Sequence, residues 1–410
     1  MTWYRINLMN ICSIPEGDNL KYANLVERLQ GERTSAWDIH SAAKQAAAQG
    51  EDVIVLSVGD PDFPTPGPIV KRAIEALHDG DTHYSGVVGR ENLREAIAAQ
   101  HQKETGRTVT KANVFICAGA QNGLFASSLC LCEPGDEVLV PEPMYLTYEA
   151  AIRASGATLV PVPVNAGNGF HLDSEALRRA VTPRTRAIFF ATPCNPTGVV
   201  MPREHLEQIA ALAHQHDLWV VSDEVYADLT FDREHVSIAS LEGMANRTLT
   251  LGSFSKSHAM TGWRLGWVIG PETAIGHLGR LALCMLYGLP GFIQQAGLAA
   301  LENRSAVVVQ MRELYRRRRD VVFEHLKTVE GLDCLLPEAG MFMMIDIRGT
   351  GLSTYDFTWQ LFREKGVSLL DAGLFGETAA GFVRLGLVVD EPRLVEACDR
   401  IADFLRERRA

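Results

Sequence analysis

The stretch LTLGSFSKSHAMTGWRLGWVIG, residues 249–270, decides the fold of this chain. It begins with a short apolar run that stops at Gly252, and two serines and Lys256 follow. A glycine turn, Arg264 and a second apolar run complete it. A lysine at the end of a buried strand can lose its charge by desolvation and become a nucleophilic amine. On this stretch alone, a surface turn with a solvated lysine is the other interpretation.

The chain around this stretch predicts a mostly parallel sheet covered by helices. Short apolar runs alternate with helical patterns, which is typical of parallel strands buried on both faces. The expected strands are residues 113–117, 136–140, 157–162, 187–191, 218–222, 249–251 and 265–268. We therefore predict an α/β protein whose large domain has a mostly parallel seven-stranded sheet flanked by helices.

A smaller α/β domain is expected from the two ends of the chain. A strand is predicted at 52–58, a long helix at 304–328, and short strands mixed with helices after it. The predicted division is an N-terminal arm with part of the small domain (1–62), a large domain (63–302) and the rest of the small domain (303–410). The basic run Arg316 to Arg319 is interpreted as a solvated face of the long helix.

The composition of the chain indicates which kinds of binding partner and location to expect. The net charge of −11 over 410 residues argues against nucleic acid or an anionic membrane as the main partner. No apolar run approaches the length of a membrane span, and the first residues lack the apolar segment of a signal peptide. Cysteines are few, and those in apolar runs are expected to be small buried hydrophobes: Cys117, Cys130, Cys132 and Cys284. We expect a cytoplasmic protein without disulfides or a bound metal.

Polar residues follow several predicted strands, at the edge of the sheet where α/β proteins bind ligands. Gly119-Ala120-Gln121 opens a helix, where free N–H groups favour a phosphate. Asn195 and Asp223 each follow a buried run, and Tyr145 is expected to start the next helix after another. Each has a plainer explanation in isolation: a turn glycine, a turn asparagine, a helix cap or a core tyrosine.

Taken together, these groups suit one ligand. Lys256 can form a Schiff base, Asp223 can pair with a protonated ring nitrogen, and Arg264 with a helix end can bind a dianion. A ligand with an aldehyde, a pyridine nitrogen, a ring hydroxyl and a phosphate is pyridoxal 5′-phosphate. The sequence has no GxGxxG and no GxxxxGK[ST], which argues against nicotinamide and nucleoside-triphosphate sites.

The motifs, in this order, resemble the class I aminotransferases of the pyridoxal-phosphate fold type I family, from about residue 25 to the C-terminus. They are GDPDF (59–63), HYSGVVG (83–89), GAQ (119–121), NPTG (195–198), SDEVY (222–226), SFSK (253–256), GWRLGW (262–267) and FVRLG, which contains Arg384.

The resemblance implies a role for each matching residue. Lys256 would carry the Schiff base and then move the proton, and Asp223 would keep the ring nitrogen protonated. The other cofactor contacts implied are Tyr226 and Asn195 to the ring oxygen, Tyr145 stacked on the ring, and the main chain of Ala120 and Gln121 with Ser253 and Arg264 on the phosphate. Arg384 would bind the substrate carboxylate, helped by Gly59 N–H and Asn195.

The resemblance also implies a homodimer with shared active sites, because Tyr84 would reach the phosphate of the neighbouring subunit's cofactor. In the family a small polar residue crosses the dimer before a Pro…Gln pair. This chain has Leu286-Tyr287-Gly288-Leu289-Pro290 there, with Gln294 after it. That departure puts the cross-dimer contact in doubt.

Three stretches carry a narrower resemblance to bacterial arginine–pyruvate aminotransferases: AWDIH (36–40), SKSHAMTGWR (255–264) and LALCMLYG (281–288). Trp37, Asp38 and His40 fall where the family's N-terminal segment lines the side-chain pocket. A carboxylate and an indole there would suit a cationic substrate, although an aspartate is also favourable at any helix N-terminus. The expected reaction moves the α-amino group of L-arginine, or of a broader range of amino acids, to a 2-oxo acid such as pyruvate.

Other reactions stay open at this point, since a fold does not fix a reaction. An aspartate, alanine or aromatic aminotransferase, a β-lyase and an amino-acid oxidase could all use this site. A non-catalytic regulator that binds the cofactor is disfavoured, because the chain has neither the length nor the basic segment for an added DNA-binding domain.

Overall fold

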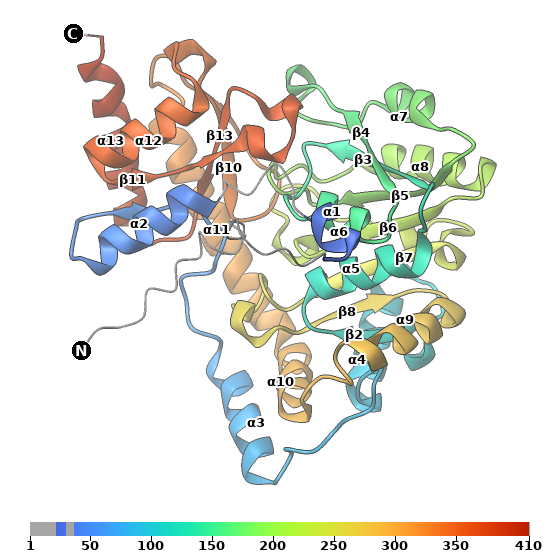
Figure 1. Cartoon of the computed structure of the whole chain (residues 1–410). Helices are drawn as coiled ribbons and strands as arrows, with labels where there is room; N and C mark the ends of the chain where they lie inside the picture. Colours follow the sequence, from blue (N-terminus) through green and yellow to red (C-terminus); the bar gives the residue numbers. More distant parts are fainter. Residues whose placement is uncertain (1–21, 30–36, 410) are drawn as a thin grey trace.

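The computed structural model describes residues 22–29 and 37–409, and its centre is a seven-stranded sheet (Figure 1). The strand order is β2-β8-β7-β6-β5-β3-β4. These strands are β2 Val114–Cys117, β3 Glu137–Glu142, β4 Thr158–Pro163, β5 Thr185–Ala191, β6 Trp219–Asp223, β7 Thr248–Ser253 and β8 Gly266–Ile269. β8 runs antiparallel to β2 and β7, and the other neighbours pair in parallel. The predicted fold class and all seven predicted strands are confirmed.

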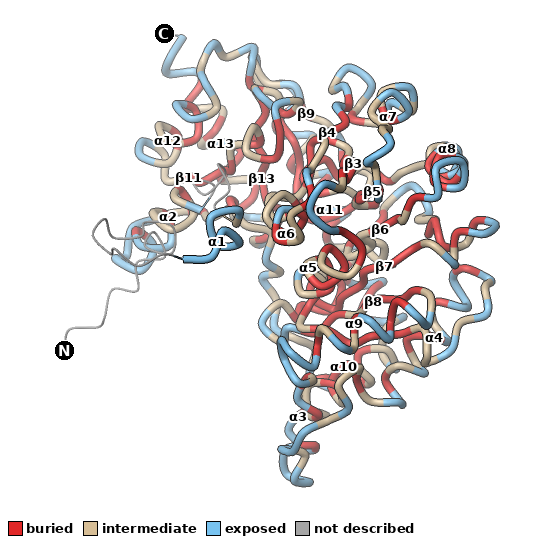
Figure 2. Tube along the Cα trace, turned by 45° about the vertical axis from the view of Figure 1, so that its right-hand side comes forward, coloured by how far each residue is buried: buried red, intermediate tan, exposed pale blue. Residues whose placement is uncertain are grey.

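Helices cover both faces of this sheet because its side chains alternate. On β3, Val138 packs toward α5 Ala120–Leu131, α6 Tyr148–Ala154 and α9 Glu272–Met285, whereas Leu139 packs toward α7 Ser174–Ala180 and α8 Arg203–Gln215. The edge near β2 and β8 is covered by α3 Gly67–His78, α4 Glu91–Thr105 and α10 Gly291–Glu302. Figure 2 shows the central strands as buried and the outer turns of the helices as exposed.

The two ends of the described chain meet in a second core. β1 Ile54–Val55 pairs in parallel with β11 Val367–Ser368, beside a four-stranded sheet in the order β12-β13-β10-β9. Its strands are β9 Asp333–Leu335, β10 Phe342–Asp346, β12 Leu370–Asp371 and β13 Phe382–Gly386, and its helices are α2 Asp38–Ala48, α11 Arg304–Leu326, α12 Thr354–Lys365 and α13 Glu391–Glu407.

One expectation at the N-terminal end changes. The strand predicted at 52–58 is only two residues long: Asp52 lies at the surface, where it pairs with Arg393 and Arg400, and residues 57–59 belong to the loop that lines the cavity described below. Of the N-terminal arm, the structure describes α1 Asn24–Arg28, whose Arg28 Nε donates to the Arg153 carbonyl over 3.0 Å. Residues 1–21 and 30–36 lie outside the described part. The domain boundaries at 62/63 and 302/303 stay a prediction.

The interpretation of Arg316 to Arg319 as a solvated face is wrong for half of the run. Arg318 and Arg319 are 3% and 4% exposed and lie on the buried side of α11. Arg318 pairs with Asp62 and Arg319 with Asp232, so each buried charge has a carboxylate partner. The apolar residues Met311, Tyr315 and Val322 recur at helical spacing and place Arg318 and Arg319 on the same side of α11, so periodicity indicated their burial. It could not name their partners, which are far away along the chain.

Two smaller expectations also differ. Cys284 is exposed at the C-terminal end of α9, next to other exposed apolar side chains: Leu283, Met285, Leu286 and Tyr287. Cys130 is partly buried, whereas Cys117 and Cys132 are buried as expected. Tyr145 does not start a helix but lies in the turn before α6. All seven cysteines of the described residues are free.

Within the described ranges, no helix has both the length and the apolar character needed to cross a membrane. The same residues contain no group of three or more histidine, cysteine, aspartate or glutamate side chains arranged to hold a metal ion.

Gly266 is where β8 passes closest to the start of α5. A Cβ built there would lie 2.7 Å from the Ala120 nitrogen and 2.8 Å from the Gly252 carbonyl oxygen. Because both are backbone atoms, we predict that Gly266→Ala lowers the free energy of unfolding by about 1–3 kcal/mol. Thermal and denaturant unfolding measure this change.

The matched control is Gly276→Ala in α9, where a new Cβ meets nothing within 4 Å. That variant should be as stable as the parent or up to about 1 kcal/mol more stable. Equal stability of the two variants would contradict the close approach at Gly266.

Candidate active site

A cavity of about 320 Å³ opens at the carboxyl ends of the central strands. Its wall brings together almost all of the residues predicted from the sequence: Trp37, Gly59, Ala120, Gln121, Tyr145, Asn195, Asp223, Tyr226, Ser253, Lys256, Arg264 and Arg384. This is the edge at which open α/β sheets bind ligands. Two predicted residues, Tyr84 and Asp38, are not part of this wall.

Lys256 follows β7 and reaches into the cavity. Its Nζ donates to the Gly59 carbonyl oxygen over 2.6 Å. Burial lowers the pKa of Lys256 to about 8, with the negative charge of Asp60 acting in the opposite direction. The neutral amine, which is the nucleophilic form, is therefore a larger fraction near physiological pH than in an ordinary lysine.

Asp223 ends β6, and its carboxylate has two donors. The Tyr148 hydroxyl donates to Oδ2 over 3.0 Å, and the Val225 N–H donates to Oδ1 over 3.2 Å. Burial raises the pKa of Asp223 to about 6, although both hydrogen bonds favour the charged form. A cation placed beside this carboxylate would lower its pKa again.

Tyr148 is a residue that the sequence analysis missed. It is buried on α6, three residues after Tyr145, and burial raises the pKa of its hydroxyl well above the usual value. A tyrosine on the apolar face of a helix needs a partner for its hydroxyl, and that requirement was a usable signal. The sequence could not say that the partner is Asp223, 75 positions away.

The helix α5 and Arg264 form a positively polarised end of the cavity. No side chain caps α5 at Gly119, so its first N–H groups remain available to an anion. Arg264 has φ of 52°, and its Nη1 donates to the Thr261 carbonyl over 2.7 Å. Glycine suits position 119 because its φ is 80°, and a Cβ there would lie 2.5 Å from Arg264 Nη2 and displace this side chain.

The serine hydroxyl at this end also has partners. Ser253 Oγ lies 2.8 Å from Ser255 Oγ and 3.0 Å from the Leu265 carbonyl oxygen, and it accepts from the Ser255 N–H. The Gln121 side chain points to Thr147, whose hydroxyl donates to Gln121 Oε1 over 2.6 Å.

Arg384 lies on β13 at the opposite side of the cavity and is 5% exposed. Its Nη1 donates to Asn195 Oδ1 over 2.8 Å and its Nη2 to the Ser57 carbonyl over 3.1 Å. The guanidinium carbon lies 5.4 and 5.1 Å from the ring centroids of Phe342 and Phe375. None of these partners carries a negative charge, so this buried cation is suited to an incoming carboxylate.

The aromatic wall consists of Tyr145, Tyr226 and Trp37. Burial raises the pKa of both tyrosine hydroxyls, so both stay protonated near neutral pH and can donate a hydrogen bond. Trp37 is 47% exposed, directly before α2. Asp38, the first residue of α2, is partly buried outside the wall.

Tyr84 lies away from this cavity, with 88% of its surface exposed and its ring centroid 5.0 Å from that of Tyr287. A single chain therefore gives Tyr84 no contact with its own site. Two wall residues that the sequence analysis did not single out are Asp60 and Thr261, whose hydroxyl donates to Asp60 Oδ1 over 2.7 Å.

The donor set fits pyridoxal phosphate. An uncapped helix end and Arg264 lie at one end, Lys256 and Asp223 project into the same cavity, and the cation Arg384 lacks an anionic partner. The helix end with Arg264 suits a phosphate, Lys256 suits an aldehyde carbon, and Asp223 suits a protonated ring nitrogen. Arg384 suits the carboxylate of a substrate.

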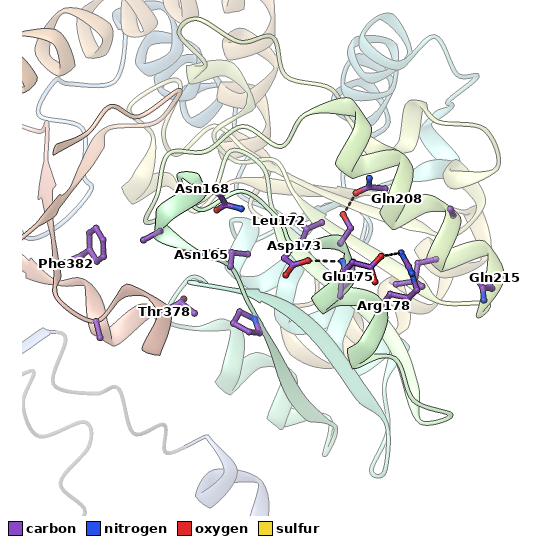
Figure 3. Close-up of a pocket in the computed structure, with 18 of the residues that line it drawn as sticks. Asn165, Asn168, Leu172, Asp173, Glu175, Arg178, Gln208, Gln215, Thr378 and Phe382 are labelled. Carbon is purple, nitrogen blue, oxygen red and sulfur yellow. Dashed lines mark hydrogen bonds and ion pairs between the residues drawn. The ribbon is translucent and has the colours of Figure 1, made fainter. Parts of the chain in front are cut away.

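Another hollow, of about 870 Å³, lies between α7, α8 and a loop of the small sheet (Figure 3). Its wall contains no lysine, and several of its polar side chains are paired with one another, as in Arg178 with Glu175 and Ser174 with Gln208. It therefore offers no nucleophile for the expected chemistry.

Comparison with known proteins supports the same conclusion. The profile of the family "Aminotransferase class I and II" matches residues 51–401. Arginine–pyruvate transaminase AruH of Pseudomonas aeruginosa is 52% identical over 383 residues, which is 93% of this chain and 98% of that enzyme. Aromatic-amino-acid aminotransferase 2 of Thermococcus litoralis is 38% identical, over 88% of this chain and 94% of that enzyme.

Among solved structures, the aspartate aminotransferase of Thermus thermophilus with maleate superposes with a TM-score of 0.89 at 34% identity. The match covers 94% of this chain and 99% of that one. The chain therefore belongs to the class I and II aminotransferases, and it is a pyridoxal-phosphate-dependent transaminase.

Proposed function

We propose that this transaminase takes the α-amino group from L-arginine, or from another cationic amino acid, and transfers it to pyruvate or a related 2-oxo acid. The observation that carries the general reaction is one cavity containing Lys256, Asp223 and Arg384. The 52% identity to arginine–pyruvate transaminase AruH supports the choice of substrates.

Each residue has a proposed task. The cofactor supplies a ring that stores electrons from the substrate's α-carbon. Lys256 binds the cofactor covalently, and as a free amine it moves the proton at the α-carbon, for which a pKa near 8 is suitable. Asp223 keeps the ring nitrogen protonated, and Arg384 with Asn195 and the Gly59 N–H orients the substrate carboxylate.

The remaining contacts hold the cofactor. We assign the phosphate to Ser253, Arg264 and the main chain of Ala120 and Gln121, which is consistent with the uncapped start of α5. Tyr226 and Asn195 are assigned to the ring oxygen and Tyr145 to the ring face.

Trp37 and Asp38 are the proposed determinants of a cationic side chain. The indole of Trp37 lies in the cavity wall, where it can stack on a guanidinium. Asp38 is next to it in sequence, so a substrate that extends past Trp37 could approach its carboxylate.

The proposed assembly is a homodimer with shared sites. The exposed Tyr84 and the exposed apolar residues 283 and 285–287 support this assignment, because an isolated chain leaves them in water. Gln294 links the two segments, since its Nε2 donates to Ser85 Oγ over 2.9 Å and to the Leu289 carbonyl over 2.8 Å. A cytoplasmic location stays a prediction.

For substrate choice, we expect L-arginine alone to change the absorbance of the bound cofactor and pyruvate to reverse the change. Asp38→Ala should raise KM for arginine about fivefold, the size of a partly exposed ion pair, and leave KM for alanine unchanged. Steady-state kinetics with both amino acids measures this.

A response to aspartate or an aromatic amino acid, with none to arginine, would contradict the cationic substrate but not the transaminase assignment. Pyruvate and ammonia released from one amino acid, without an added 2-oxo acid, would favour a lyase or oxidase reaction. Equal changes in KM for arginine and alanine would remove Asp38 from the proposal.

For the ring-nitrogen carboxylate, we expect cofactor affinity of the apoprotein to rise as pH increases through about 6, because Asp223 must lose its proton to pair with a cation. Tyr148→Phe removes a hydrogen bond that favours the charged form. The midpoint should therefore move up by about one pH unit. Fluorescence titrations with pyridoxal phosphate at a series of pH values measure it.

The control is Tyr315→Phe, which removes a buried hydroxyl that has no hydrogen-bond partner. Its midpoint should match the parent protein. If the midpoint of Tyr148→Phe also matches the parent protein, the Tyr148 hydroxyl does not lower the pKa of Asp223.

For the shared site, Tyr84→Phe should weaken cofactor binding about tenfold, as expected for a lost hydrogen bond to a charged group. When subunits with Tyr84→Phe are mixed with subunits with Lys256→Ala, hybrid dimers should regain one normal site. This follows because that site takes Lys256 from one subunit and Tyr84 from the other. Cofactor titration of the mixture measures this recovery of normal affinity. If no site with normal affinity appears, Tyr84 acts within its own subunit.

A further inference from the structure

We propose that Asp62 and Arg318 are positioning residues for the site that binds the substrate carboxylate. Their ion pair holds the loop of residues 57–63 against the segment that follows Arg384. This inference rests on the proposed function, since it uses the assignment of Arg384 and Gly59 to the carboxylate.

The ion pair is bidentate and lies at the buried face of α11. Arg318 Nη1 donates to Asp62 Oδ1 over 2.7 Å, and Nη2 donates to Oδ2 over 2.8 Å. Nη1 also donates to the Leu387 carbonyl over 2.9 Å. Leu387 is three residues beyond Arg384, so one guanidinium joins the loop to the end of β13.

The loop itself contacts the reacting groups. The Ser57 carbonyl accepts from Arg384 Nη2 over 3.1 Å, and the Gly59 carbonyl accepts from Lys256 Nζ over 2.6 Å. Asp60 accepts from the Thr261 hydroxyl and lies in the cavity wall. A displacement of this loop would therefore move the surroundings of both Arg384 and Lys256.

Regular secondary structure does not fix this loop, because β1 ends at Val55 and α3 begins at Gly67. The Asp62 end is instead held by charge and by packing. The Arg318 guanidinium carbon lies 5.3 Å from the Phe63 ring centroid, and Phe63 packs edge-on against Tyr315. Because the planar guanidinium of Arg318 binds the Asp62 carboxylate through two hydrogen bonds, it fixes the orientation of that carboxylate as well as its distance.

The same helix provides a matched comparison. Arg319 is equally buried. Its Nη1 donates to Asp232 and lies 3.2 Å from the Pro337 carbonyl, and its Nε donates to Asp320, so Asp232→Asn removes one of its two carboxylate partners. Asp232 and Pro337 are not part of the cavity wall. Loss of this second ion pair should affect folding without moving the loop of residues 57–63.

The test compares Asp62→Asn with Asp232→Asn in the holoenzyme, using calorimetry with 5-guanidinopentanoate and with pentanoate. The first probe is arginine without its amino group, and the second has the carboxylate alone, so neither can react. Asp62→Asn should weaken both probes about 10- to 100-fold, the effect of a small misplacement, with KM rising more than kcat falls. Asp232→Asn should change both affinities less than twofold.

Asp62→Glu keeps the charge and should recover part of the lost affinity, which a merely structural role does not predict. Unchanged probe affinity in Asp62→Asn, with only a lower melting temperature, would overturn the proposal. Should Asp62→Asn not fold, Arg318→Lys decides instead, because it keeps the charge but loses the bidentate contact with Asp62. Unchanged probe affinity in that variant overturns the proposal, and a measurable loss supports it.

Arg384→Lys separates this inference from the proposed function. If that variant binds pentanoate as well as the parent does, the carboxylate site itself is misassigned and the inference falls with it. If it loses pentanoate while Asp62→Asn does not, only the positioning role is wrong. Binding of pentanoate without any gain from the guanidinium of the first probe would contradict arginine specificity and leave the positioning role supported.

Discussion

The active site depends on the burial of two ionisable groups, Lys256 and Asp223, in a cavity at the carboxyl ends of the central strands. Burial favours the neutral forms of Lys256 and Asp223, which moves the pKa of the first to about 8 and of the second to about 6. Parallel strands make this possible, because β6 and β7 end side by side and present both groups to one space. The apolar cores on the two faces of the sheet keep these strand ends in place.

The second constraint is that the cavity wall comes from distant parts of the chain. The loop of residues 57–63 lies before the large sheet in sequence, and Arg384 comes more than 100 residues after its last strand. β1 pairs with β11, and the Gly386 N–H donates to the Leu56 carbonyl over 2.8 Å. The small sheet therefore brings both ends of the chain to the same side of the cavity, where a substrate carboxylate can contact both.

Local patterns revealed most of this arrangement, and distant pairings account for the rest. All seven central strands follow from short apolar runs, and the motif residues follow from their places after those strands. The hydrogen bond from Tyr148 to Asp223 and the ion pair of Arg318 with Asp62 connect positions far apart in sequence. No periodicity names these partners. Periodicity does place Arg318 and Arg319 on the apolar side of α11, so the interpretation of the basic run as solvated overlooked a usable pattern. The prediction for Cys284 is wrong because its apolar run lies at the exposed end of α9.

Two buried charges of this cavity, Asp223 and Arg384, are suited to pair with charged groups of the cofactor and the substrate. A protonated ring nitrogen would lower the pKa of Asp223 again, so cofactor binding would offset the cost of burying this carboxylate. Burial lowers the pKa of Lys256, and the neighbouring cations Arg384 and Arg264 lower it further against the charge of Asp60, which favours the neutral amine that the chemistry needs. Arg384 stays charged despite burial, because a guanidinium holds its proton, and a substrate carboxylate is the anion it lacks. Cofactor binding would therefore offset the cost of burying Asp223, and amino-acid binding would offset the cost of burying Arg384. Both buried charges lie in the wall of the same cavity.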